Sequence, residues 1–117
     1  MVKKWEIYFL NFNPITGSEQ AGIRPALVIS TDIINRRLPV FTVIPLSSIQ
    51  KGDIIYPYEV ELPKSTTGLP KDSVALVYQM RTISTERVSL ASKSGLITEQ
   101  KIKDNINQAI IEFFELD

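Results

Sequence analysis

The chain reads GSEQAGIRPALVIS over residues 17–30, and this stretch decides the fold because a polar loop passes directly into a dense apolar strand. Proline confines the residue before it to extended conformations, so Arg24, which precedes Pro25, is held in a strand-like backbone. The apolar run that follows, residues 26–29, suits a central strand of a sheet. The stretch therefore predicts a rigid strand that begins at an arginine, and a guanidinium held in this way can bind a phosphate.

The composition limits the chemistry that the chain can perform. Its 117 residues, 44% of them hydrophobic, fit one globular domain over residues 1–117. The chain has no cysteine, which excludes disulfides and thiolate catalysis, and no histidine, the commonest acid–base group near neutral pH. We expect neither a metal nor another cofactor. Because 13 basic residues balance 13 acidic ones, binding of a nucleic acid requires local segregation of charge.

The opening residues, MVKKWEIYFL, predict a first strand rather than a signal peptide. Their apolar run is short, it contains Glu6, and no small-residue cleavage site follows. No run in the chain approaches the roughly 18 apolar residues of a membrane-spanning helix. We therefore expect a cytoplasmic protein with no membrane partner.

Short extended segments separated by loops with proline or glycine dominate the rest of the chain. In the first of them, Ile7 and Phe9 alternate with Glu6 and Tyr8, which predicts a half-buried strand. Pro45 demands a bulge or an end in the third. The expected strands are residues 5–10, 26–29, 40–46, 58–62 and 73–78, with shorter extended pieces at 82–84 and 88–91 and a helical turn at 31–37.

The last segment is different, because its apolar residues recur at helical spacing. They are Ile102, Ile106, Ala109, Ile110 and Phe113. This spacing predicts one amphipathic helix over residues 99–115, with Thr98 as its amino-terminal cap. The fold class is therefore mainly β: a small antiparallel barrel or sandwich of five to seven strands, followed by a C-terminal helix.

Polar and basic residues stand just beyond the apolar strands, where they can converge at one rim of a barrel. The candidates are Gly17, Ser18, Glu19, Gln20, Arg24, Ser47, Ser48, Gln79 and Arg81. In the functional interpretation Arg24 binds a phosphate, a serine hydroxyl beside it donates a hydrogen bond or a proton, and Arg81 is a second cation. In the alternative interpretation Arg24 is a surface arginine, the two serines are turn hydroxyls, and Arg81 pairs with an acid. Without a histidine, neither serine can act as the nucleophile of a triad.

Three motifs in order resemble the MazF/PemK family of bacterial toxins. They are GSEQAGIRPALVIS at residues 17–30, VIPLSS at 43–48 and DSVALVYQMRTIS at 72–84. The resemblance implies a small SH3-like barrel with a C-terminal helix, which usually forms a homodimer. It also implies metal-independent, sequence-specific cleavage of single-stranded RNA, in which the ribose 2′-hydroxyl attacks the adjacent phosphorus. The products would carry 2′,3′-cyclic phosphate and 5′-hydroxyl ends.

The resemblance also suggests roles for individual residues. Arg24 matches the family's catalytic arginine, which stabilises charge on the phosphorane, and Ser47 matches a Thr or Ser hydroxyl that protonates the leaving oxygen. Ser18 stands where some relatives carry histidine, and Tyr78 stands where several carry an acid. These departures leave the general base open, with Glu19 as the candidate. The expected substrate contacts are Gly17, Ser18, Gln20, Ser48, Gln79 and Arg81.

The family's second partner is an antitoxin, whose acidic and partly disordered C-terminal segment would compete with RNA for one groove. Two further functions fit a barrel of this kind. One is a non-enzymatic, gyrase-directed toxin that resembles CcdB, and the other is a protein-binding module. Neither of these would cleave RNA.

Overall fold

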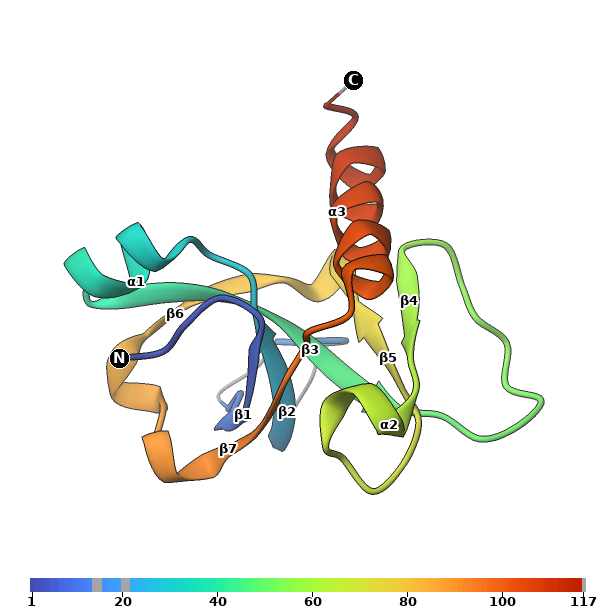
Figure 1. Cartoon of the computed structure of the whole chain (residues 1–117), viewed down its shortest axis with the longest axis horizontal. Coiled ribbons are helices and arrows are strands. Elements are labelled where there is room, and N and C mark those ends of the chain that lie inside the picture. The colour runs from blue at the N-terminus through green and yellow to red at the C-terminus, as the bar shows by residue number, and fades with distance from the viewer. Residues whose placement is uncertain (14–15, 20–21, 117) are drawn as a thin grey trace.

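The structure is a computed structural model, and it describes residues 1–13, 16–19 and 22–116. These residues form seven strands, three α-helices and three short 3₁₀ turns (Figure 1). The strands are β1 (Glu6–Asn11), β2 (Ile23–Val28), β3 (Val40–Ser48), β4 (Glu59–Leu62), β5 (Ser73–Leu76), β6 (Arg81–Ser84) and β7 (Lys93–Leu96). The helices are α1 (Asp32–Arg37), α2 (Lys64–Thr67) and α3 (Gln100–Phe114), and the 3₁₀ turns are η1 (Val77–Gln79), η2 (Thr85–Arg87) and η3 (Leu90–Ser92).

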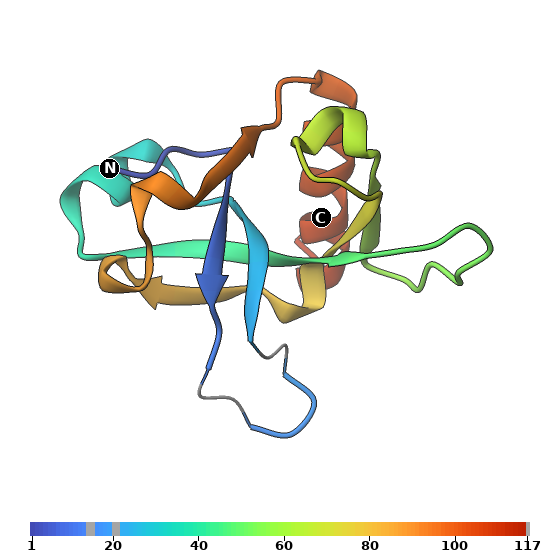
Figure 2. The same cartoon turned by 90° about the horizontal axis from the view of Figure 1, so that it is seen from below.

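The strands form one curled antiparallel sheet in the order β4–β5–β3–β2–β1–β7, and β6 pairs with β3 outside this path. The long strand β3 runs through the middle of the molecule, and residues 16–19 lie beyond the ends of β1 and β2 (Figure 2). The expected fold class, a mainly β antiparallel fold with a C-terminal helix, is confirmed. The curled sheet forms a half-barrel. Strand β3 links its two parts, because its first section pairs with β2 and β6 and its last section pairs with β5.

Both faces of the sheet are buried, which changes the expected orientation of β1. One apolar cluster contains Ile7, Leu27 and Ile44, and the other contains Tyr8 and Leu10. The prediction of a single buried face was therefore wrong: Tyr8 is 2% exposed, whereas Phe9 is 39% exposed. A curled sheet places an apolar cluster on each side of its central strands, so side chains of both parities are buried.

Pro45 does not end β3 or introduce a bulge, as the sequence predicted. Residues 40–43 of β3 pair with β6, and residues 46–48 pair with β5. Pro45 lies between these two sections, opposite Ala26 of β2. The missing N–H of this proline therefore removes no rung from the ladders with β5 and β6, and the strand continues through it.

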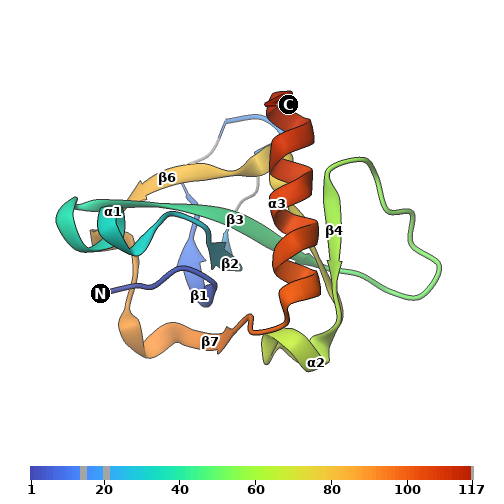
Figure 3. The ribbon, with the colours of Figure 1, turned by 45° about the horizontal axis from the view of Figure 1, so that its top comes forward.

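Helix α3 is confirmed, and it covers the sheet beside β4 (Figure 3). It buries Ile102, Ile106 and Ala109. Its N-cap is Glu99, which makes no side-chain capping bond, so the expected cap at Thr98 was wrong. Residues 88–91 were expected to be extended but lead into η3, and β7 and α2 were not predicted. These short elements are fixed by contacts with β1 and with each other rather than by local periodicity.

The carboxylate of Glu6 is buried between β1 and β7. It forms an ion pair with Lys93 at 2.6 Å, and it accepts hydrogen bonds from the Tyr8 hydroxyl at 2.8 Å and from the Lys3 amide at 2.6 Å. Burial by itself would raise the pKa of Glu6, but the bonds from Lys93, Tyr8 and Lys3 outweigh it and hold the pKa below its ordinary value. The same network raises the pKa of Tyr8, through burial first and then through the bond to Glu6.

Replacing Glu6 by glutamine is expected to lower the free energy of unfolding at pH 7 by about 2 kcal/mol, because it removes charge-assisted hydrogen bonds. A lowered folded pKa stabilises the protein above the ordinary value of 4.5, and this contribution is lost as the pH falls through the folded pKa. Urea unfolding of both proteins at pH 7 and pH 3 measures the effect. The difference should be smaller at pH 3 than at pH 7, and an equal difference at both pH values would contradict the assignment.

Candidate active site

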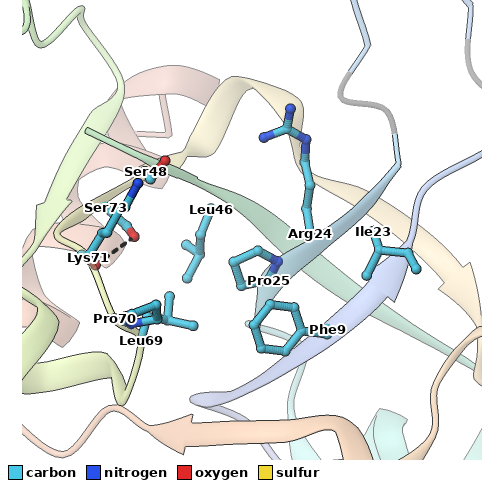
Figure 4. A pocket seen from close by; sticks show the side chains of 10 residues that line it. All are labelled: Phe9, Ile23, Arg24, Pro25, Leu46, Ser48, Leu69, Pro70, Lys71 and Ser73. Atoms are coloured by element: carbon cyan, nitrogen blue, oxygen red, sulfur yellow. Dashed lines mark hydrogen bonds between the residues drawn. The ribbon is translucent and has the colours of Figure 1, made fainter. Parts of the chain in front are cut away.

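A pocket of about 410 Å³ opens where β2 and β3 separate. The pairing between these strands covers Val28–Val43, Leu27–Ile44 and Ala26–Pro45, after which β3 pairs with β5. The pocket is lined by Phe9, Ile23, Arg24, Pro25, Leu46, Ser48, Leu69, Pro70, Lys71 and Ser73 (Figure 4). The Arg24 side chain extends away from the apolar floor that Phe9, Pro25 and Leu46 form (Figure 4).

This pocket, here called the arginine pocket, combines an apolar floor with two cations and two hydroxyls. The cations are Arg24 and Lys71. The hydroxyls belong to Ser48 and Ser73, which stand opposite each other in the β3–β5 register. A guanidinium and an ammonium can bind an anionic group, and the floor can accept a flat apolar ring beside it. Arg24 and Ser48, both predicted from the sequence, are thus brought together.

A second pocket of about 350 Å³ contains three other predicted residues, Glu19, Gln79 and Arg81. The Glu19 carboxylate accepts a hydrogen bond from the Thr16 amide at 2.7 Å, which closes a turn within the loop. Gln79 Nε2 donates to the Ser18 carbonyl at 3.4 Å. The loop between β1 and β2 is therefore attached to η1, and the second pocket lies between them.

Arg81 has a different partner from the acid that the alternative interpretation expected. Its guanidinium donates to the carbonyl of Phe12 at 3.3 Å and lies 5.6 Å from the centre of the Phe12 ring. Arg81 thus holds the start of the loop between β1 and β2 through the Phe12 carbonyl, and it also lines the second pocket. Support of the loop and contact with a ligand are compatible, because a guanidinium has five N–H donors.

Ser47 lines a third pocket, of about 510 Å³, rather than the arginine pocket. Successive side chains of a strand point to opposite faces, so Ser47 and Ser48 diverge at the end of β3. Tyr78 lines both the second and the third pocket, and its hydroxyl donates to Glu59 at 2.6 Å. Burial, and then the bond to Glu59, raises the pKa of Tyr78 to about 12. The Tyr78 hydroxyl is thus held by a carboxylate from β4.

The end of β3 joins all three pockets. Pro45 lines the second pocket, Leu46 and Ser48 line the arginine pocket, and Ser47 lines the third. The β2–β3 pairing ends at Ala26–Pro45, before it reaches Arg24 or Ser47. Ser48 therefore shares a pocket with Arg24, whereas Ser47 lines a different pocket at the same strand end.

The remaining predicted residues lie in the loop between β1 and β2. Gly17 has a φ of +56°, a conformation that favours glycine, and Ser18 contributes the carbonyl that Gln79 contacts. Gln20 lies outside the described residues. The sequence did not indicate Lys71, Ser73 or Glu59, because only the pairing of β5 with β3 and β4 brings these residues to the pockets. Of these three residues, only Lys71 has a local signal in the sequence, because it directly follows Leu69 and Pro70.

In the part of the chain that the structure describes, no group of three or more acidic side chains could hold a metal ion. Among the same residues, no helix is long and apolar enough to cross a membrane.

Comparison with known proteins identifies the family. Residues 3–114 match the family described as PemK-like, MazF-like toxin of type II toxin–antitoxin system. Endoribonuclease EndoA of Bacillus subtilis is 41% identical over 90 residues, which cover 76% of each chain. Endoribonuclease MazF of Staphylococcus saprophyticus is 37% identical over 111 residues, covering 94% of this chain and 88% of that protein.

Solved structures agree with this result. MazF of Deinococcus radiodurans superposes with a TM-score of 0.73 at 26% identity, covering 97% of this chain and 96% of the other. A mycobacterial endoribonuclease in complex with its cognate antitoxin superposes with a TM-score of 0.78 at 17% identity, covering 100% and 98%, and this likeness shows the fold alone. The chain therefore belongs to the PemK-like, MazF-like toxins of type II toxin–antitoxin systems.

Proposed function

We propose that this protein is the toxin of a toxin–antitoxin pair and that it cleaves single-stranded mRNA in the cytoplasm at specific short sequences. The observation that supports this proposal best is the arginine pocket, together with relatives that are themselves named endoribonucleases. The pocket offers cations for a phosphate and an apolar floor for a base. The names of these relatives do not support the gyrase-directed alternative or a simple binding module.

The proposed reaction uses a nucleophile from the substrate. The ribose 2′-hydroxyl attacks the adjacent phosphorus, its proton passes to a base, and the 5′-oxygen of the next nucleotide leaves with a proton from an acid. This yields a 2′,3′-cyclic phosphate and a 5′-hydroxyl. A chain without histidine or cysteine can support this reaction, because it has only to bind the phosphate, stabilise its charge and move protons. DNA lacks the 2′-hydroxyl and should resist cleavage.

We assign Arg24 to the stabilisation of charge on the phosphorane, Ser47 to the protonation of the leaving oxygen and Glu19 to the general base. The bond from Thr16 fixes the position of the Glu19 carboxylate in the second pocket. Gly17, Ser18, Gln20, Ser48, Gln79 and Arg81 are assigned to contacts with the RNA. A single RNA strand that crosses the end of β3 would reach all three pockets, because consecutive residues of β3 line them.

We further propose that the protein acts as a homodimer and that its partner is a cognate antitoxin. The family description, a toxin of a type II toxin–antitoxin system, supports the second part. An acidic and partly disordered segment of the antitoxin would occupy the arginine pocket, because its carboxylates compete with phosphates for Arg24 and Lys71.

The decisive experiment incubates the purified protein with a long single-stranded RNA in the presence of EDTA. We expect cuts at discrete sequences, 5′-hydroxyl ends and 2′,3′-cyclic phosphates, and no cleavage of a DNA of the same sequence. Cleavage that EDTA abolishes would point to a metal-dependent nuclease. An intact RNA, in a preparation that arrests growth when it is expressed, would favour a toxin with another target.

A further inference from the structure

Side chains, rather than a strand, bind the outer edge of β1 beyond Tyr8. Strand β7 pairs with β1 only through Glu6, Ile7 and Tyr8. Carbonyls of alternate residues point to the same edge of a strand, so those of Phe9 and Asn11 face the side that β7 has left, and the Asn13 carbonyl follows just past the end of β1. The single hydroxyl hydrogen of Ser92 is shared between Phe9 O, 3.0 Å from Oγ, and Ser89 O, 2.7 Å from it.

Arg87 binds the other two carbonyls. Its NH1 nitrogen, at the end of η2, donates to Asn13 O at 2.7 Å and to Asn11 O at 3.2 Å. From β6, Arg81 NH1 donates to the intervening carbonyl of Phe12 at 3.3 Å. Two guanidinium groups therefore hold three successive carbonyls. Arginine is suited to this task, because it carries five donors in a fixed planar arrangement and stays charged.

These contacts lie where the loop between β1 and β2 begins. The Phe12 amide donates to Gly22 O at 2.9 Å, and the Gly22 amide donates to Asn13 Oδ1 at 3.2 Å. Phe12 and Asn13 thus form the last hydrogen bonds across to Gly22 before the loop. The loop then places Glu19 in the second pocket. On the return side the chain leads through Ile23 to Arg24.

We propose that Arg87 is a positioning residue for RNA cleavage: it fixes the start of the loop that carries the candidate base. This inference rests on the proposed function, and it extends that function to a residue outside all three pockets. The contacts of Arg87 are with backbone carbonyls, so its effect on a substrate is transmitted through the loop. A direct contact with an RNA phosphate is the competing explanation for any loss of activity.

The first test measures hydrogen exchange of backbone amides by NMR in the RNA-free protein. In Arg87→Ala we expect the Phe12 amide to exchange about tenfold faster, because its rung loses the carbonyl contacts on either side. The amides of Leu27 and Ile44, in the β2–β3 ladder, should exchange as before. Arg37→Ala is the matched control, because Arg37 is an exposed residue of α1 and its replacement also removes one positive charge. Unchanged exchange at Phe12, or equal acceleration at all of these amides, would overturn the proposal.

The second test measures steady-state cleavage of a short RNA. Arg87→Ala is expected to lower kcat about tenfold with a smaller change in KM, and Arg87→Lys should recover only part of it, because an ammonium lacks the planar pair of donors. The dependence of KM on salt should stay unchanged. A phosphate contact would instead raise KM, be rescued by lysine, and flatten the salt slope by about 0.7 for each lost contact.

The two tests separate the failure of this inference from that of the proposed function. If the wild-type protein does not cleave RNA, the proposed function fails, while the exchange measurement still decides whether Arg87 holds the loop. Faster exchange at Phe12 with unchanged kcat and KM would show that the contact is structural only, and would overturn the positioning role.

Discussion

Replacing Arg24 by alanine is expected to reduce kcat of RNA cleavage by about 10²–10³-fold, the usual effect of losing one preorganised group that stabilises charge in a transition state. Arg24 lies where β2 and β3 separate, and it lines the pocket that also holds Lys71. Pro25 restricts its backbone, and the β1–β2 pairing between Leu10 and Arg24 fixes its place in the sheet. A lysine at this position keeps the charge but loses the fork of donors, so Arg24→Lys should remain impaired by at least tenfold.

Single-turnover cleavage of a short RNA, with the protein in excess, measures this effect without interference from product release. Arg37→Ala, in α1, is again the control for the loss of one positive charge. Circular dichroism of each variant checks that the fold is retained. Near-normal turnover by a folded Arg24→Ala protein would remove Arg24 from the reaction, and with it the proposed mechanism.

The second large effect concerns the two serines at the end of β3. We expect Ser47→Ala to lower kcat by about 10²-fold, which is typical for the loss of a general acid. Ser48→Ala should chiefly raise KM, by about fivefold, because it would lose one hydrogen bond to the substrate. These expectations follow from the assignment of Ser47 as the acid and of Ser48 as a contact with the RNA.

The shared pocket of Arg24 and Ser48 supplies the opposite expectation, so the pair of variants is a direct test. If Ser48→Ala loses kcat while Ser47→Ala is nearly unaffected, the proton donor is Ser48, and the arginine pocket contains the reacting group. A substrate whose leaving oxygen is replaced by sulfur sharpens the test, since such a leaving group needs no protonation. Cleavage of this substrate should be nearly the same in the wild-type protein and in the variant that lacks the acid.

Local sequence rules found most of the elements correctly. The strand at residues 26–29, the helical turn at 31–37 and the long C-terminal helix were predicted from the sequence, and all three are present as β2, α1 and α3. Thr31 does cap α1, since its side chain accepts a hydrogen bond from Ile34 N. By contrast, the strand KSGL at β7 has no β-branched residue and no alternation, so only its pairing with β1 defines it.

The candidate site was predicted as a set of residues but not as an arrangement. Arg24, Ser47, Ser48, Gln79 and Arg81 could be selected because each follows or precedes an apolar strand. Their distribution over three pockets could not be predicted, because it depends on which way each side chain leaves β3 and on where β3 changes partner from β2 to β5. Lys71 and Glu59 enter the pockets from strands and loops far away in the sequence.

The sequence by itself determined the class of fold, the rigid Arg24–Pro25 junction and the absence of histidine and cysteine chemistry. These properties depend on residue type and on neighbours in the chain, so they can be read locally. Only the tertiary structure decided that Arg81 and Arg87 hold the start of the loop, that Tyr78 is bound to Glu59, and that Ser47 and Ser48 face different pockets. Such contacts join residues 19 to 76 positions apart, and they form only when the curled sheet brings its strands together.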